Sequence, residues 1–60
     1  DPLRETAEHR LIKCLADAGR RIEALQQYEL FCQILQRELS MTPPPETEAL
    51  ARRIRLDPAD

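Results

Sequence analysis

The chain has 60 residues, with nine Lys and Arg against eleven Asp and Glu, which gives a formal net charge of -2 at pH 7. This balance creates no overall field that attracts phosphates, so nonspecific binding to nucleic acid is disfavoured. No apolar run is long enough for a signal peptide or a membrane span. Because so short a chain forms only a small core, we expect a single helical module cut from a longer cytoplasmic protein, stabilised partly by a neighbour.

The first expected helix runs from about residue 2 to residue 18. Asp1 has the form of an N-cap, and Pro2 fits the first turn of a helix, where its missing N–H costs nothing. Apolar residues recur every three or four positions, which predicts one buried stripe. The members of this stripe are Leu3, Ala7, Leu11, Cys14, Leu15 and Ala18. Gly19, the only glycine, fits the left-handed position that ends a helix.

A second helix is expected from about 20 to 39, because nothing in that stretch breaks a helix and the three prolines 43–45 follow it. Its main apolar stripe is made of Ala24, Leu25, Tyr28, Phe31, Cys32, Leu35 and Leu39. The prolines predict a stiff, extended connector, since residues before proline are disfavoured in the α region.

The two stripes are predicted to close on each other as an antiparallel hairpin. If the chain turns at Gly19, Leu15 faces Ala24 and Leu11 faces Tyr28, so that small residues meet large ones and the helices approach closely. The predicted seam of the hairpin consists of Leu11, Leu15, Gly19, Ala24, Leu25, Tyr28 and Phe31.

A third helix is expected from about 45 to 56. Pro45 suits its first turn, acidic residues lie near its start and arginines lie near its end, as the helix dipole favours. These charged residues are Glu46, Glu48, Arg52, Arg53 and Arg55. The predicted fold is therefore all-α, a helical hairpin plus a third, C-terminal helix.

The second helix carries an additional apolar face. Ile22, Leu30 and Ile34 project about 100° or more away from its main stripe, and the first helix cannot cover both sides. The third helix, with Leu50 and Ile54 one turn apart, is one possible cover. An adjacent repeat or a second copy of the chain is the other. These five residues form the candidate interaction surface.

The residues that most often carry chemistry point to none here. His9, the only histidine, lies off the apolar stripe, and we expect it in solvent rather than acting as a base. Cys14 and Cys32 lie about 10 Å apart along the predicted hairpin, which is too far for a disulfide, and they lack metal-ligand spacing. We expect two free, buried thiols, typical of a reducing compartment. The sequence predicts no catalytic, cofactor or metal site, and no enzyme.

The hairpin resembles the tetratricopeptide pattern, in which a Gly at the turn is followed at fixed distances by Ala, Leu and an aromatic residue. The residues that carry this resemblance are Gly19, Ala24, Leu25 and Tyr28, with Leu11 and Leu15 at the matching positions of the first helix. A tetratricopeptide-like hairpin is the fold that this resemblance implies.

From Asp1 to about Ile54, the chain also resembles the bacterial transcriptional activator domain of antibiotic-pathway regulators. The resemblance is carried by the opening DPLRE, by the turn ADAGRR with the EAL that follows and Tyr28, and by the tail ELSMTPPPE. Ser40 stands where the family has Gly, which disfavours a left-handed cap at that point. Pro44 replaces the small residue that would serve as N-cap of the third helix.

This resemblance implies a module inside a larger regulator, in which a separate winged-helix domain binds the promoter and the helical domain supports dimerisation or activation. Its partners would be proteins, through self-association or contact with the rest of the regulator. One alternative is a tetratricopeptide scaffold of a signalling protein that binds a peptide. Another is a nucleic-acid-binding unit that uses basic residues. These are Arg20, Arg21, Arg52, Arg53 and Arg55.

Overall fold

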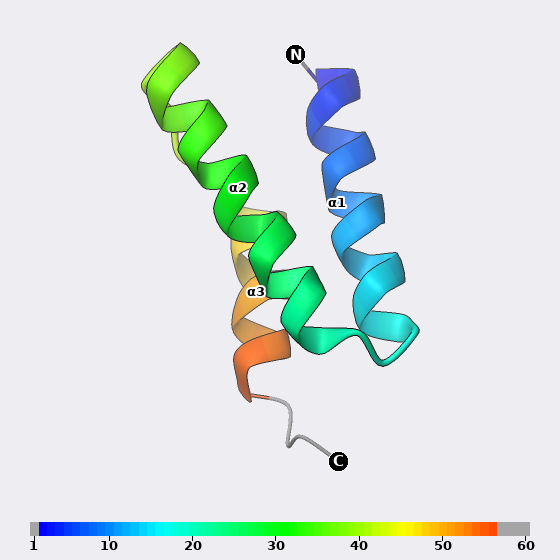
Figure 1. Cartoon of the computed structure of the whole chain (residues 1–60). Coiled ribbons are helices and arrows are strands. Elements are labelled where there is room, and N and C mark those ends of the chain that lie inside the picture. The colour runs from blue at the N-terminus through cyan, green and yellow to red at the C-terminus, as the bar shows by residue number, and fades with distance from the viewer. Residues whose placement is uncertain (1, 57–60) are drawn as a thin grey trace.

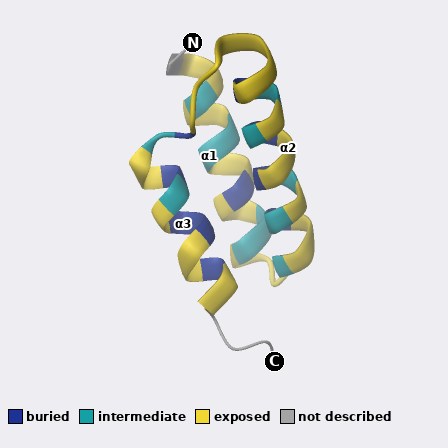
Figure 2. Ribbon diagram, turned by 90° about the vertical axis from the view of Figure 1, so that its left-hand side faces the viewer, coloured by how far each residue is buried: buried dark blue, intermediate teal, exposed yellow. Residues whose placement is uncertain are grey.

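The computed structural model describes residues 2–56, which form three α-helices and their connections (Figure 1). The helices are α1 (Pro2–Asp17), α2 (Arg21–Leu39) and α3 (Pro45–Leu56). α1 and α2 run antiparallel as a hairpin, and α3 packs against one side of this pair (Figures 1 and 2). The predicted all-α hairpin with a third helix is confirmed. Asp1, the expected N-cap, lies outside the described residues.

The turn between α1 and α2 depends on Gly19, whose φ of +79° lies in the left-handed region. Its N–H donates to the carbonyl of Ala16 at 3.0 Å, and the N–H of Arg20 donates to the carbonyl of Leu15 at 2.8 Å. These two bonds form a Schellman motif, which satisfies carbonyls left free at a helix end. The role predicted for Gly19 is therefore confirmed.

α2 also ends in a left-handed residue, although the residue is not glycine. Ser40 has φ 52° and ψ 42°, and its N–H donates to the carbonyl of Gln36 at 3.2 Å. The N–H of Met41 donates to the carbonyl of Leu35 at 3.2 Å. The cap therefore forms although Ser40 was expected to disfavour it, because the following prolines end the helix here and the N–H groups of Ser40 and Met41 find carbonyl partners.

The start of α3 is capped by backbone rather than by a side chain. The N–H groups of Thr47 and Glu48 both donate to the carbonyl of Pro44 at 3.0 Å. Pro45 begins the helix, and acidic residues in the first turn and basic residues in the last turn agree with the helix dipole. Pro44 has no side-chain group that could cap the helix, but its backbone carbonyl accepts the first hydrogen bonds of α3.

The core lies where all three helices meet. The buried residues that cluster there are Ile12 of α1, Ala24 and Tyr28 of α2, and Leu50, Ala51 and Ile54 of α3. Of the predicted seam, Ala24, Tyr28 and Phe31 are buried, and Leu15 and Leu25 are half-buried against the cluster.

One seam residue was placed wrongly. Leu11 is 43% exposed, whereas its neighbour Ile12 is completely buried. The prediction selected the α1 stripe with the most apolar members, and the structure instead buries the stripe about 100° away, which contains Ile12. Ile12 joins the core cluster with residues of α2 and α3, and Leu15 and Ala16 pack against the same cluster.

Candidate interaction surface

α3 is held on the hairpin by its whole apolar side. Leu50 and Ile54 are 7% and 6% exposed and contact the α1 and α2 residues of the core. The sequence placed both residues on the candidate interaction surface. That assignment was wrong, because their side chains fill the space between α1 and α2 and are not accessible to another molecule.

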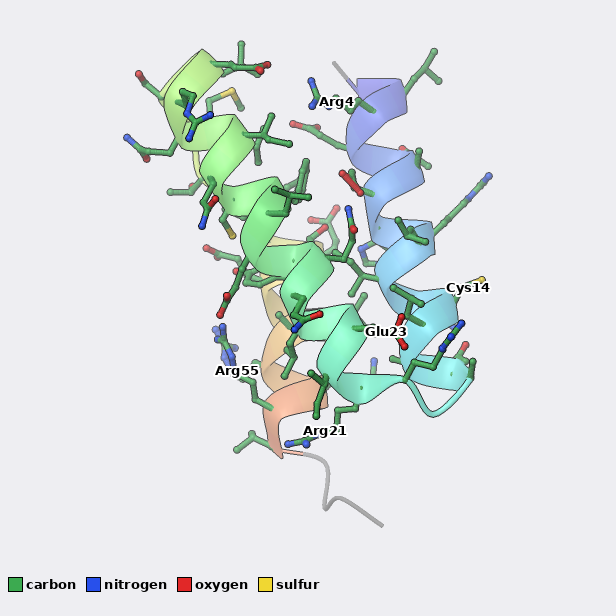
Figure 3. All side chains as sticks on the ribbon, viewed as in Figure 1. Arg4, Cys14, Arg21, Glu23 and Arg55 are labelled. Carbon is green, nitrogen blue, oxygen red and sulfur yellow. The ribbon has the colours of Figure 1, made fainter. Side chains whose placement is uncertain are left out.

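Polar contacts add to the docking of α3 at both of its ends. At the start, His9 Nδ1 lies 3.1 Å from Oγ1 of Thr47, a residue that is almost completely buried. At the other end, Arg21 donates from Nε to the carbonyl of Ile54 at 2.8 Å and from Nη2 to the carbonyl of Arg55 at 3.2 Å. Figure 3 shows Arg21 reaching from the start of α2 to the end of α3.

Two sequence expectations change as a result. His9 is half-buried against α3 rather than surrounded by solvent. Arg21, one of the basic residues considered for nucleic-acid contact, instead caps free carbonyls at the C-terminus of α3. Arg20 pairs with Glu23, with 2.8 Å between Nε and Oε1. Both arginines of the turn are therefore engaged within the chain.

Tyr28 joins the core to the surface on the α3 side. The guanidinium of Arg55 lies 5.6 Å from the centroid of the Tyr28 ring, a distance that allows a cation–π contact. Burial raises the pKa of Tyr28 to about 12, and the hydrogen bond with the Cys32 side chain adds to this rise. Tyr28 therefore stays neutral and packed throughout the physiological pH range.

Both cysteines are free thiols, but only one is shielded. Cys32 is half-buried and packs against the core, whereas Cys14 is exposed, in contrast to the burial expected for both. Figure 3 shows the Cys14 side chain pointing away from α2. Cys14 belongs to the α1 stripe that the structure leaves outside the core.

The extra apolar residues of α2 stay uncovered by α3. Ile22 is 68% exposed and Leu30 is 49% exposed, while Ile34 is half-buried. The contact from Gln27 Nε2 to Glu8 Oε1, 2.9 Å long, marks the side of α2 that faces α1. Viewed along the axis of α2, Leu30 is rotated about 60° from Gln27. This rotation is in the direction opposite to Arg21, which contacts α3, so Leu30 points away from α3. Leu30 and Ile34 thus border α1 on the side of the hairpin that lacks α3.

α1 contributes the matching side of this surface. Glu8 faces α2 and His9 faces α3. Viewed along the axis of α1, Leu11 is rotated about 60° from Glu8, in the direction opposite to His9 and therefore away from α3. Leu3, Ala7 and Leu11 are exposed along the same stripe. Figure 2 shows the side of α2 that lies away from α3 coloured largely as exposed.

We define the open face as the apolar surface on the side of the hairpin opposite α3. It consists of Leu3, Ala7 and Leu11 from α1 and Leu30 and Ile34 from α2. Ile22 lies about 80° around α2 from Leu30, toward the outer edge of the face, and is not counted among these five residues. The sequence analysis assigned Leu30 and Ile34 to the candidate interaction surface, and it assigned Leu3, Ala7 and Leu11 to the buried stripe of the first helix.

The described residues contain no candidate metal centre, since no three His, Cys, Asp or Glu side chains group together between residues 2 and 56. In that same part of the chain, no helix is both long and apolar enough to cross a membrane.

The fold and the open face define an all-α helical domain with one apolar side unfilled. The bacterial transcriptional activator domain family matches residues 1–55, and the chain belongs to this family. Membership places the domain in the context of bacterial transcriptional activators. No curated protein and no solved structure matches the chain.

Proposed function

We propose that this chain is a protein-interaction module of a bacterial transcriptional activator, working in the cytoplasm, and that a separate domain of the regulator binds DNA. The observation that carries this proposal is the open face, where large apolar side chains remain in water on a very small domain. Grouped apolar exposure of this kind is typical of surfaces that bind another protein. We further propose that the module has no enzymatic activity.

The packing of α3 supports an interaction role for the opposite side. α3 already fills one side of the hairpin with Leu50, Ala51 and Ile54. The open face presents apolar residues from the same two helices, so another helix could pack against it as α3 packs against the opposite side. Filling it removes Leu11 and Leu30 from water, at roughly 25 cal/mol for each Å² of apolar surface buried.

The arginines of the turn favour this proposal over nucleic-acid binding. Arg21 donates to the carbonyls at the end of α3, and Arg20 pairs with Glu23. The orientation of each guanidinium is therefore already set by partners within the chain. The overall charge of -2 also opposes such binding.

A reporter assay tests the proposed function directly. The chain is fused to a monomeric, heterologous DNA-binding domain whose operator controls a reporter gene. We expect the fusion to raise reporter expression above that of the DNA-binding domain alone. Leu30→Glu should abolish the rise, because it places a charge in the middle of the open face.

Leu56→Glu is the matched control for this assay. Leu56 is an exposed leucine at the end of α3, on the other side of the molecule. The same substitution there should leave reporter expression unchanged. Equal expression from the wild-type and Leu30→Glu fusions, with both proteins present at equal levels, would contradict the proposal.

A further inference from the structure

The charged side chains of the hairpin differ in whether the chain itself pairs them. The acidic residues nearest the open face each have a hydrogen-bond or ion-pair partner among residues 2–56. They are Glu8, Asp17, Glu23 and Glu38. Other charged residues of α1 and α2 have no such partner in this part of the chain. They are Glu5, Arg10, Glu29 and Arg37.

Both of the unpaired cations lie at the edge of the open face. Arg10 comes seven residues after Leu3, and Arg37 comes seven residues after Leu30. Seven residues turn an α-helix by about 700°, so each arginine lies two turns along its helix and within about 20° of that leucine. Both arginines are exposed. Arg37 also borders a surface groove beside Met41 on the other side of α2, as a residue at an edge does.

The two unpaired anions lie away from this face. Glu5 lines a surface cavity beside α3, together with His9 and Thr47. Glu29 is rotated about 160° from Gln27, whose side chain contacts α1, so Glu29 points away from α1. The unpaired charges that border the open face are therefore both positive, one from each helix of the hairpin.

We infer that the open face binds an amphipathic helix of another protein, whose apolar stripe has carboxylates along both edges. The inference rests on the proposed function and gives the chemistry of the partner. In this complex the apolar stripe of the partner covers Leu11 and Leu30, and its carboxylates meet Arg10 and Arg37. The interface then has an apolar centre and a rim of opposite charges, as protein interfaces commonly have.

A helix is the expected form of the partner because the hairpin already packs a helix on its other side. The 12-residue α3 fills that side with Leu50, Ala51 and Ile54. An amphipathic helix presents one apolar stripe between two polar edges, and its backbone hydrogen bonds are satisfied within the helix. The open face has the matching form, an apolar stripe between two cations.

A second copy of the chain and a nucleic acid both fit this face less well. The open face of a second copy carries the same two cations, and the acidic residues beside them are already paired. Like charges at the rim oppose that interface. A nucleic acid supplies negative charge, but its phosphate backbone offers no apolar stripe that covers Leu11 and Leu30.

Two synthetic peptides test this inference. Each has about 18 residues, enough for partial helix formation in isolation, and carries leucines on one face. One peptide has glutamates along both edges of the leucine stripe, and the other has lysines there. Isothermal titration calorimetry with the 60-residue chain should show about tenfold tighter binding of the glutamate peptide at low salt. The difference should shrink at high salt, because exposed charges are screened.

Charge reversal of the two arginines should reverse this preference. R10E and R37E should each weaken binding of the glutamate peptide about threefold, and the R10E/R37E double variant should bind the lysine peptide more tightly. R52E, at an exposed arginine of α3, is the matched control and should leave the preference unchanged. Circular dichroism should show equal helix content in all variants.

The outcomes separate the acidic partner from the proposed function. Equal affinity of the wild type for both peptides would overturn the inference, as would a preference that R10E/R37E leaves unchanged. Failure of both peptides to bind at about 1 mM would overturn it too. Dimers of the wild type that exclude both peptides and are lost in Leu30→Glu would make a second copy the occupant. The reporter assay decides the interaction role independently, because it does not depend on the charge of the partner.

Discussion

Ser40 ends α2 in a conformation that a side chain disfavours. Its φ of 52° lies in the left-handed region, where a residue with a Cβ costs roughly 1 to 2 kcal/mol more than glycine does. The cap forms nevertheless, because the prolines that follow cannot continue the helix and the N–H groups of Ser40 and Met41 find carbonyl partners. Local preference at this residue is overruled by its neighbours in the chain.

Ser40→Gly should therefore stabilise the domain, by about 0.5 to 1 kcal/mol after the greater freedom of glycine in the unfolded chain is included. Chemical denaturation measures the free energy of unfolding. Gly19→Ala is the reverse substitution at the other left-handed position, and it serves as the control. No atom lies within 4 Å of an added Cβ at Gly19, so its cost of about 1 kcal/mol comes from φ alone. A stability unchanged by Ser40→Gly would show that the cap is not strained.

Tyr28 gives the stability of the domain a dependence on alkaline pH. Its pKa is raised to about 12 in the folded state, chiefly by burial, against an ordinary value of 10.0. A raised pKa contributes stability that is complete below pH 10 and is lost as pH rises toward 12. We expect the midpoint of urea unfolding to fall between pH 10 and pH 12.

Tyr28→Phe removes the titrating hydroxyl and keeps the ring beside Arg55. In this variant the decline of stability between pH 10 and pH 12 should be smaller than in the wild type. An equally steep decline in both proteins would assign the effect to other groups.

At the scale of the elements, α3 is positioned by contacts that its own sequence does not contain. Arg21 binds the carbonyls of Ile54 and Arg55, and His9 lies beside Thr47, so residues of both hairpin helices hold its two ends. The helix itself was predictable from Pro45 and from the charges in its first and last turns. The position of α3 on the hairpin was not predictable, because the side chains of Leu50 and Ile54 could pack against any apolar surface.

Arg21→Ala should loosen the end of α3 and lower the free energy of unfolding by about 1 kcal/mol, since two charge-assisted hydrogen bonds to carbonyls are lost at a partly exposed site. Hydrogen exchange should show faster amide exchange in the last turn of α3. Arg20→Ala removes only an exposed ion pair and should cost less than about 0.5 kcal/mol. Similar effects of the two substitutions would argue against a cap by Arg21.

At the scale of the whole molecule, the rotation of α1 divides its apolar residues between two environments. Ile12 enters the three-helix core, and Leu11 goes to the open face. Periodicity favoured the stripe of Leu11 because it has more apolar members, but the number of members does not reveal how many helices surround each side. On the core side of α1, Ile12 is surrounded by residues of α2 and α3, and Leu15 packs beside it, whereas no helix lies over the open side.

Because Ile12 is buried and Leu11 is exposed, truncating each of them to Ala should lower the free energy of unfolding by different amounts. Ile12→Ala should lower the free energy of unfolding by about 2 to 4 kcal/mol, because it leaves a cavity among three helices. Leu11→Ala should cost less than about 1 kcal/mol, since much of its side chain is already in water. Both are measured by denaturation at concentrations too low for self-association. Equal costs would place Leu11 in the core after all.

The local structure of this protein was predictable from its sequence: three helices, their approximate bounds and the glycine turn, together with the resemblance that the family match over residues 1–55 confirmed. These features follow from backbone preferences and short-range spacing, which a chain carries wherever it is placed. Only the tertiary structure decided which apolar stripe of α1 is buried, that Leu50 and Ile54 belong to the core, and that one side of the hairpin stays open. The physical reason is that a helix can bury either of two apolar stripes, and the choice depends on where the other helices lie.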